Sequence, residues 1–162
     1  MPDRLGPLDV TFLHVEDGVS HMHIGSISLF AGPPPSEREL LRVVEAKLHL
    51  APRYRQRVLN VPFDLGRPVW VDDPHFQLAY HVRRTALASP GGDRELCRLV
   101  GRVMSQQLDR HRPLWEMWVV ERMSGGRWAV ISKMHHAMVD GISGSTLSTL
   151  VLDERADAEP AA

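Results

Sequence analysis

The spacing of apolar and polar residues divides most of the chain into short elements separated by proline and glycine clusters. Four runs have the β-branched and aromatic content typical of strands, at 22–30, 75–85, 114–122 and 127–135. The last two are joined by Met-Ser-Gly-Gly, which predicts a hairpin with a short glycine-rich loop. Since apolar and polar positions are mixed along the last run, we expect that strand to be half-buried.

Three stretches have apolar residues at helical spacing. The first begins at Ser36, where Glu39 three residues later completes a capping box, and Pro52 ends it. The second runs from about 93 to 108 after a Ser-Pro-Gly-Gly turn, and the third covers 143–152. Between 53 and 75, prolines and turn clusters interrupt the apolar runs, which predicts short strands and loops.

Composition places the chain among ordinary globular proteins. Its 162 residues suffice for one domain with a real core, and 43% of them are hydrophobic. The formal charge of -1 argues against nucleic acid as the main partner. Cys97 is the only cysteine, which excludes an intrachain disulfide, and the N-terminus has no basic patch followed by an apolar segment. Since no run of 18 or more apolar residues occurs, we expect a cytoplasmic protein with at most peripheral membrane contact.

The candidate chemistry lies at the end of the strand 127–135, where His135 and His136 are followed by Asp140 and Gly141. The glycine and the helical spacing after it predict a strand-to-helix junction, which can expose side chains to a cleft. An imidazole with its ordinary pKa of about 6.5 is mostly neutral near pH 7 and can accept a proton. A metal site using His136 and Asp140 is the alternative, but the sequence places no third ligand.

This heptapeptide resembles the HHxxxDG signature of acyltransferases that use coenzyme A or carrier-bound substrates. That group includes chloramphenicol acetyltransferase, the condensation domains of peptide synthetases, and the bacterial wax ester synthase/diacylglycerol acyltransferase family. The signature alone does not choose among them.

The remainder of the chain favours the wax ester synthase/diacylglycerol acyltransferase family. The segment 112–116 resembles the PLW motif of that family through Pro113, Leu114 and Trp115. The segments 22–25 and 68–84 are similar to it as well, and the resemblance is collinear over roughly residues 5–152. It implies an α/β (α+β) fold, the N-terminal half of a chloramphenicol acetyltransferase-like fold, with a mixed β-sheet flanked by helices. Trp115 and Trp118 fall on opposite faces of their strand, so we expect at least one in the core.

The resemblance also implies a reaction, in which a fatty acyl group moves from acyl-CoA to the hydroxyl of diacylglycerol or a long-chain alcohol. His136 would take the hydroxyl proton, while His135 would support it. Asp140 would hold the loop through a basic partner, and Gly141 would give the turn its backbone freedom. Pro113, Leu114 and Trp115 would bind substrate or support the motif. Acyl-CoA enters as a co-substrate, with no other cofactor and no metal, and contact with the inner membrane or lipid droplets would be peripheral.

Arg94, Arg98 and Arg102 recur every four residues along the helix predicted at 93–108, away from its apolar residues. The simpler interpretation is a solvated face. A second is attraction for the phosphates of coenzyme A or for anionic lipid head groups.

The predicted domain covers residues 1–152. The polar composition of residues 153–162 predicts a disordered tail or the start of a linker. By resemblance, family members have a second domain of similar fold, with the acyl channel between the two. We therefore expect a truncated or split N-terminal half of an enzyme, which pairs with a C-terminal partner chain or self-associates. The alternative is a catalytically silent fragment that binds lipid or a partner. A condensation-type enzyme acting on carrier-bound groups is disfavoured by the PLW segment.

Overall fold

The computed structural model describes residues 3–139, and its centre is a four-stranded sheet. The strands are β2 (His23–Ala31), β5 (Val82–Ala86), β6 (Trp115–Met123) and β7 (Arg127–His135), in the order β2-β7-β6-β5. All neighbours are antiparallel except β5 and β6, which are parallel. The predicted mixed sheet and the β6–β7 hairpin are therefore confirmed, and Gly125 and Gly126 in the hairpin loop both have positive φ.

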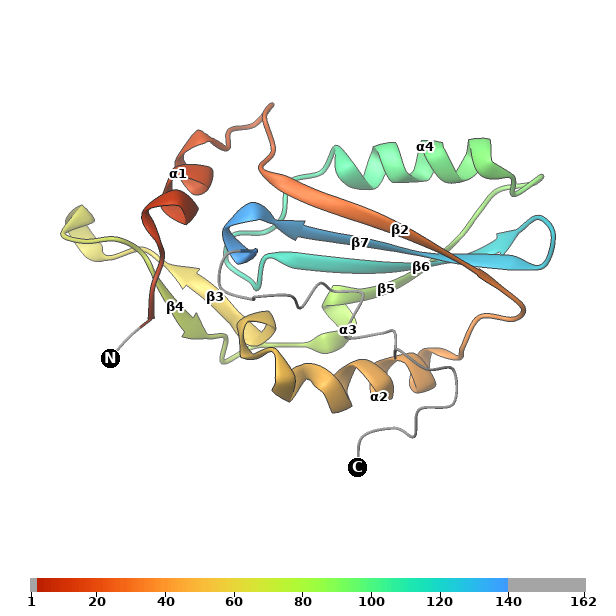
Figure 1. Ribbon diagram of the computed structural model, residues 1–162, viewed down its shortest axis with the longest axis horizontal. Helices are drawn as coiled ribbons and strands as arrows, with labels where there is room; N and C mark the ends of the chain where they lie inside the picture. The colour runs from red at the N-terminus through yellow and green to blue at the C-terminus, as the bar shows by residue number, and fades with distance from the viewer. Residues whose placement is uncertain (1–2, 140–162) are drawn as a thin grey trace.

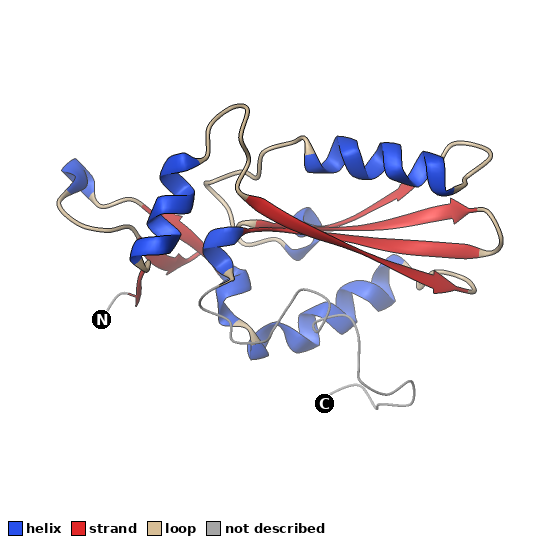
Figure 2. Cartoon of the chain, turned by 45° about the horizontal axis from the view of Figure 1, so that its top comes forward, coloured by secondary structure: helices blue, strands red, loops and turns tan. Residues whose placement is uncertain are grey.

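Strand β7 is buried on both faces, so the prediction of a half-buried strand was wrong. It lies between β2 and β6, and helices cover the sheet above and below it (Figures 1 and 2). Its polar residues are consequently buried as well, including Ser132 and Lys133. The burial of the Lys133 ammonium is compensated by hydrogen bonds, which Nζ donates to the carbonyl oxygens of Val103, at 2.9 Å, and of Gln106.

The helix α4 (Asp93–Met104) covers one face of the sheet, and α2 (Glu37–Lys47) lies across the other (Figure 1). Helix α4 buries a compact cluster against the sheet: Leu87, Leu96, Leu99, Val103, Val120, Met123, Ala129 and Ile131. The larger cluster on the other face includes Leu40 and Val44 of α2 together with Trp115. The expectation that at least one tryptophan lies in the core is confirmed by Trp115, which is fully buried.

The capping box predicted for α2 is present. The Ser36 hydroxyl accepts the Glu39 N–H at 3.3 Å, and the Glu39 carboxylate accepts the Ser36 N–H at 2.9 Å. Helix α4 ends at Met104, four residues earlier than predicted. The apolar spacing was misleading at Leu108, because the chain has turned by then and Leu108 packs into the cluster on the opposite face.

The strand predicted at 75–85 begins later, because one turn of helix, α3 (Leu78–His81), precedes β5. His81 explains the turn. Its Nδ1 lies 2.8 Å from the carbonyl oxygen of Trp115, and its ring stacks on that indole with centroids 4.7 Å apart. Tertiary contacts of this kind override a local strand preference.

A second, smaller sheet has the order β1-β4-β3, with all neighbours antiparallel. Its strands are β1 (Asp3–Arg4), β3 (Gln56–Leu59) and β4 (Val69–Asp72), so short strands between 53 and 75 are confirmed. Helix α1 (Pro7–Val15), which the apolar pattern did not predict, packs beside the 3-10 turn His136–Met138. Among residues 3–139, no helix has the length and apolar content needed to cross a bilayer. The helix predicted at 143–152 and the tail at 153–162 lie outside the described residues.

Candidate functional site

The histidine pair lies where the central strand ends. His135 is the last residue of β7, and His136 opens a 3-10 turn that runs to Met138. The backbone N–H of His135 donates to the carbonyl of Leu114 at 3.0 Å, and that of His136 donates to the carbonyl of Met22 at 2.8 Å. The pair is therefore fixed to neighbouring segments on both sides before any side-chain contact is considered.

His135 is fully buried, and both of its ring nitrogens face protein groups. Nδ1 accepts the backbone N–H of Ala137 at 3.0 Å, so the proton of the neutral ring is on Nε2. Nε2 lies 3.6 Å from Oε2 of Glu16. Burial lowers the pKa of His135 to about 4, against the opposing effect of the Glu16 charge. At neutral pH this imidazole is uncharged, and it is inaccessible to a substrate.

Glu16, the residue at the C-terminal end of α1, is the acidic partner of this arrangement. Its side chain is 1% exposed and accepts hydrogen bonds from Arg110 Nη2 at 2.7 Å, Arg110 Nε at 3.0 Å and the Met22 N–H at 3.1 Å. Burial alone would raise the pKa of Glu16. The hydrogen bonds from Arg110, Gln107 and Met22 outweigh burial, so the pKa is lowered and the carboxylate stays ionised.

His136 is in a different environment, because it is only half-buried. Its ring stacks on Phe12 of α1 with centroids 5.0 Å apart and an interplanar angle of 25°. Helix α1 therefore contacts both histidines, through Phe12 on one side and Glu16 on the other. Sequence reasoning missed this helix, and with it Phe12, Glu16 and Arg110.

The PLW segment supports the histidines mainly through its backbone. Pro113, Leu114 and Trp115 are buried, and the Leu114 carbonyl accepts the His135 N–H. Trp115 packs edge-on against Tyr54 and donates from Nε1 to the Tyr54 carbonyl at 2.8 Å. The substrate-binding or motif-supporting role of this segment stays a prediction. Leu114 also lines a cavity.

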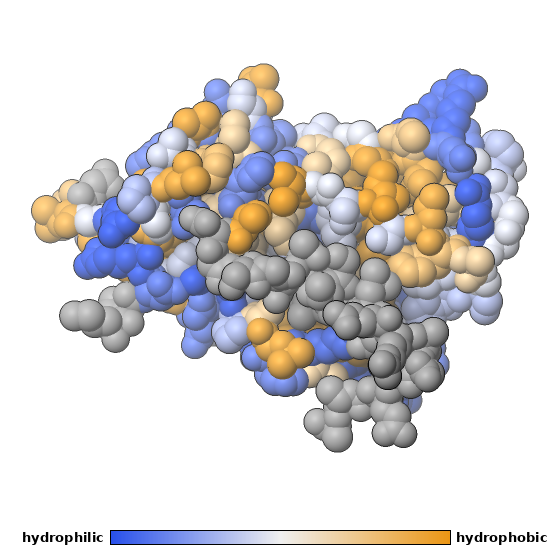
Figure 3. Space-filling view, in the orientation of Figure 1, coloured by the Kyte–Doolittle hydropathy of each residue, from blue (hydrophilic) through white to orange (hydrophobic). Residues whose placement is uncertain are grey.

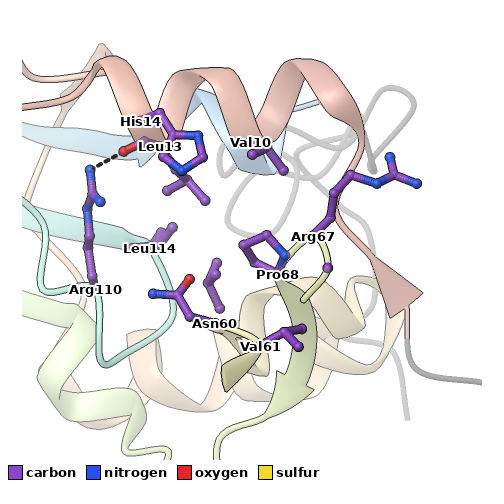
Figure 4. Close-up of a pocket in the computed structure, with 11 residues that line it drawn as sticks. Val10, Leu13, His14, Asn60, Val61, Arg67, Pro68, Arg110 and Leu114 are labelled. Carbon is purple, nitrogen blue, oxygen red and sulfur yellow. Dashed lines mark hydrogen bonds between the residues drawn. The ribbon is translucent and has the colours of Figure 1, made fainter. Parts of the chain in front are cut away.

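That cavity, of about 570 Å³, lies between α1, the β3–β4 connection and the segment before β6 (Figure 4). Most of its lining is apolar: Val10, Leu13, His14, Val58, Asn60, Val61, Gly66, Arg67, Pro68, Arg110 and Leu114. In Figure 4 the Arg110 guanidinium closes one side by donating to the Leu13 carbonyl, at 2.8 Å. The volume and the lining suit a hydrocarbon chain.

Two other groups of predicted residues remain predictions. Asp140 and Gly141 fall outside the described part of the chain. Arg94, Arg98 and Arg102 are all exposed on α4, and Arg98 and Arg102 border a hollow of about 290 Å³ together with Glu95. Within residues 3–139, no group of three or more His, Cys, Asp or Glu side chains is placed to hold a metal ion.

Solved structures with this arrangement of strands and helices define the class of protein. The first condensation domain of the calcium-dependent antibiotic synthetase matches with a TM-score of 0.67 over 84% of this chain and 33% of that chain, at 18% identity, which establishes the fold alone. The wax ester synthase/diacylglycerol acyltransferase from Marinobacter aquaeolei VT8 matches with a TM-score of 0.69 and 36% identity, over 86% of this chain and 36% of that chain. The predicted chloramphenicol acetyltransferase-like fold is therefore confirmed, and this fold is the class to which the chain belongs.

Within that class, the model of the wax ester synthase/diacylglycerol acyltransferase catalytic domain matches residues 5–162. The chain belongs to this family. Its relatives include the probable diacylglycerol O-acyltransferases tgs1 and tgs3 of Mycobacterium tuberculosis H37Rv, which are 42% and 39% identical to it. Each match covers 94% of this chain, which spans 33% of the length of tgs1 and 57% of that of tgs3.

Proposed function

We propose that this chain carries the catalytic histidine of an O-acyltransferase that moves a fatty acyl group from acyl-CoA to the hydroxyl of diacylglycerol or a long-chain alcohol. The family and the names of the relatives support an acyltransferase. The choice of acyl-CoA as donor, with no other cofactor, rests on the chemistry expected of the HHxxxDG segment.

In the proposed reaction His136 is the general base. It takes the proton of the acceptor hydroxyl as that oxygen attacks the thioester carbonyl. The new C–O bond replaces the C–S bond, and the departing thiolate of CoA receives the proton. Positioned proton transfer of this kind contributes roughly 100- to 10,000-fold to the rate.

The observation that carries this assignment is the contrast between the two histidines. His135 is buried, neutral and bonded through Nδ1, while His136 is half-buried on the ring of Phe12. A base must approach the proton it removes to hydrogen-bond distance, which favours His136. His135 is then a positioning residue, acting with Glu16 on the turn that holds His136. Asp140 and Gly141 are assigned to shaping the same turn.

The cavity beside α1 is the proposed site for a hydrocarbon chain of one lipid substrate. A complete site needs more, because excluded water and oriented donors are what stabilise the oxyanion. We therefore propose that turnover requires the additional sequence found in the longer relatives, either in the same polypeptide or as a partner chain. Membrane or lipid-droplet contact would be peripheral.

The test is an acyl-transfer assay with acyl-CoA and diacylglycerol, on the chain alone and with the C-terminal part of a relative. His136→Ala should lower turnover by roughly 100-fold or more. His135→Asn should be milder, because the amide oxygen can still accept the Ala137 N–H. Equal losses in two folded variants would refute the assignment of the base. An assembly that never transfers acyl groups would favour a catalytically silent fragment that binds lipid or a partner.

A further inference from the structure

The connection between β3 and β4 ends in two almost fully exposed apolar side chains. Phe63 is 93% exposed and Leu65 is 83% exposed. This connection, yellow in Figure 1, projects from the left end of the molecule, and apolar surface is visible at the same end in Figure 3. Phe63 has a φ of +57°, a left-handed conformation that bulky residues rarely adopt. The backbone therefore holds this ring in water in an unfavourable conformation, which points to a functional constraint.

Arg4 and Arg67 lie at the base of this tip, and Arg57 lies on β3, two residues before that strand ends. Arg4 and Arg67 are exposed, and Arg57 is partly exposed. Arg4 Nη1 donates to the Arg67 carbonyl at 3.3 Å, and Figure 4 shows the Arg67 side chain directed away from the cavity. None of these three arginines forms an ion pair with another described residue. In the sequence, Asp64 is the acidic residue between the two apolar ones.

The tip also forms part of the cavity wall described above. Both limbs of the connection line that cavity, with Asn60 and Val61 on one side and residues 66–68 on the other. The apolar tip, the three arginines and one wall of the apolar cavity thus lie on or beside the β3–β4 hairpin. Two exposed side chains bury far less than the roughly 1,000 Å² that a stable protein interface needs. Shallow insertion into a lipid surface needs only a few apolar side chains among the acyl chains and cations near the phosphates, and this tip has both.

We propose that residues 61–67 form an anchor for an anionic lipid surface. Phe63 and Leu65 insert among the acyl chains, Arg4, Arg57 and Arg67 contact lipid phosphates, and the cavity is brought to the edge of the lipid phase. Only the last part of this proposal, the delivery of a lipid acceptor from the lipid phase to the cavity, rests on the proposed function.

Co-sedimentation with vesicles tests the anchor without any enzyme activity. The 162-residue chain is mixed with vesicles of phosphatidylcholine, alone or with phosphatidylglycerol. In the double variant Phe63→Ser/Leu65→Ser, the affinity for anionic vesicles should fall roughly tenfold or more. Burying one large apolar side chain already contributes about tenfold in affinity. Binding of the wild type should fall with salt. The matched control is Val19→Ser/Leu50→Ser, which removes two exposed apolar residues outside the tip, at 89% and 67% exposure, and should bind like the wild type. Unchanged binding of the tip variant, or an equal loss in the control, would overturn the proposal.

Tryptophan fluorescence provides a second test, in which the proposal predicts a new signal on vesicle binding and not a reduced affinity. The emission of Phe63→Trp, minus that of the wild type, should shift to the blue with anionic vesicles and be quenched by brominated lipid. No shift would also overturn the anchor. An assembly with the C-terminal part of a relative that binds vesicles but transfers no acyl group would refute the proposed function without affecting the anchor.

Discussion

Glu16 and His135 form a buried pair in which only the carboxylate is charged. Arg110 supplies the compensating charge, since its guanidinium donates to Glu16 through both Nε and Nη2. The imidazole is left neutral by burial, and its fixed tautomer orients the 3-10 turn through the Ala137 N–H. The position of His136 therefore depends on two ionised residues that do not touch its ring.

His135→Asn should flatten the pH dependence of stability. Burial lowers the pKa of His135 from 6.5 to about 4, so as pH falls the unfolded chain takes up this proton first. The wild type should lose on the order of 3 kcal/mol from this group between pH 6.5 and 4, and nothing above that range. Asparagine does not titrate, so urea unfolding at several pH values should give a smaller loss. Identical slopes would show that His135 does not titrate this way.

Glu16→Gln should destabilise the fold and lower turnover, although the Glu16 side chain is not expected to contact substrate. The substitution leaves the Arg110 guanidinium without its carboxylate, at a cost of about 1–3 kcal/mol because Arg110 is partly solvated. Glu45→Gln, at an exposed position of α2, is the matched control and should be neutral. Urea unfolding measures both, and a turnover loss in Glu16→Gln should appear in kcat more than in KM. Equal stability of the two variants would contradict the coupling.

At this scale the sequence predicted the histidines but not their partners. His135, His136 and the PLW segment are recognisable because they resemble short motifs of the family. Glu16 gave no signal, because an isolated glutamate is normally exposed and only the fold buries it beside Arg110, which is 94 positions away.

Among the elements, α4 has an unusual C-terminal end. Its last carbonyl groups and those just after it are bonded by side chains from other elements: His23 with Met104 at 2.7 Å, His21 with Ser105 at 3.1 Å, and Lys133 with Val103 and Gln106. A cation here also meets the negative end of the helix dipole. This end of α4 is thus fixed to β2 and β7, close to the histidine pair.

Lys133→Met should lower stability by about 1–3 kcal/mol, because two carbonyl groups lose a charged donor. Burial lowers the pKa of Lys133, so the cost of dehydrating its ammonium offsets part of this gain. Hydrogen exchange in the last turn of α4 should accelerate. Arg94→Met on the exposed face of the same helix is the control. A Lys133 variant as stable as the wild type would mean that dehydration cancels the hydrogen bonds.

The elements that could be predicted are those whose signals are local. Helix α2 was found because Ser36 and Glu39 satisfy each other within four residues. Helix α1 was missed because Asp9 and Leu13 are its only buried residues, while apolar Leu8 and Val15 are exposed. The sequence of α1 therefore has no continuous apolar stripe by which the helix could be predicted.

For the whole molecule, the main open feature is the edge of the sheet at β2. Among the described strands β2 pairs only with β7, and Ile24, Ile27 and Leu29 on it are 38%, 46% and 52% exposed. Unpaired strand edges with exposed apolar residues favour association with another chain. The same edge is a candidate contact for the additional sequence of the longer relatives.

The chain alone should therefore self-associate through β2. Ile27→Thr/Leu29→Thr keeps the preference for a strand but removes apolar surface, so it should reduce both association and binding of a hydrophobic dye. Sedimentation velocity and dye fluorescence measure the two effects. Adding the C-terminal part of a relative should reduce them in the wild type. A wild-type monomer that binds no dye would contradict this prediction.

The large-scale architecture was predictable because the motifs occur in the order that the family requires. The second sheet and the cavity beside α1 were not, because both depend on contacts between segments far apart, such as Leu13 and Arg110. Local patterning contains no information on which loops meet, and so the exposed Phe63 was also unremarkable in the sequence.

The central place of β7 has a consequence for how the protein folds. Strand β2 pairs with it across about a hundred residues of intervening chain, and β7 is the last of the described strands to be synthesised. Closing so long a loop is slow, since its entropy cost precedes any gain from pairing. On the ribosome β2 must wait for this partner, and the strand that completes the sheet also brings the two histidines. A chain interrupted before residue 127 would have neither, so the histidine pair arrives together with the completed sheet.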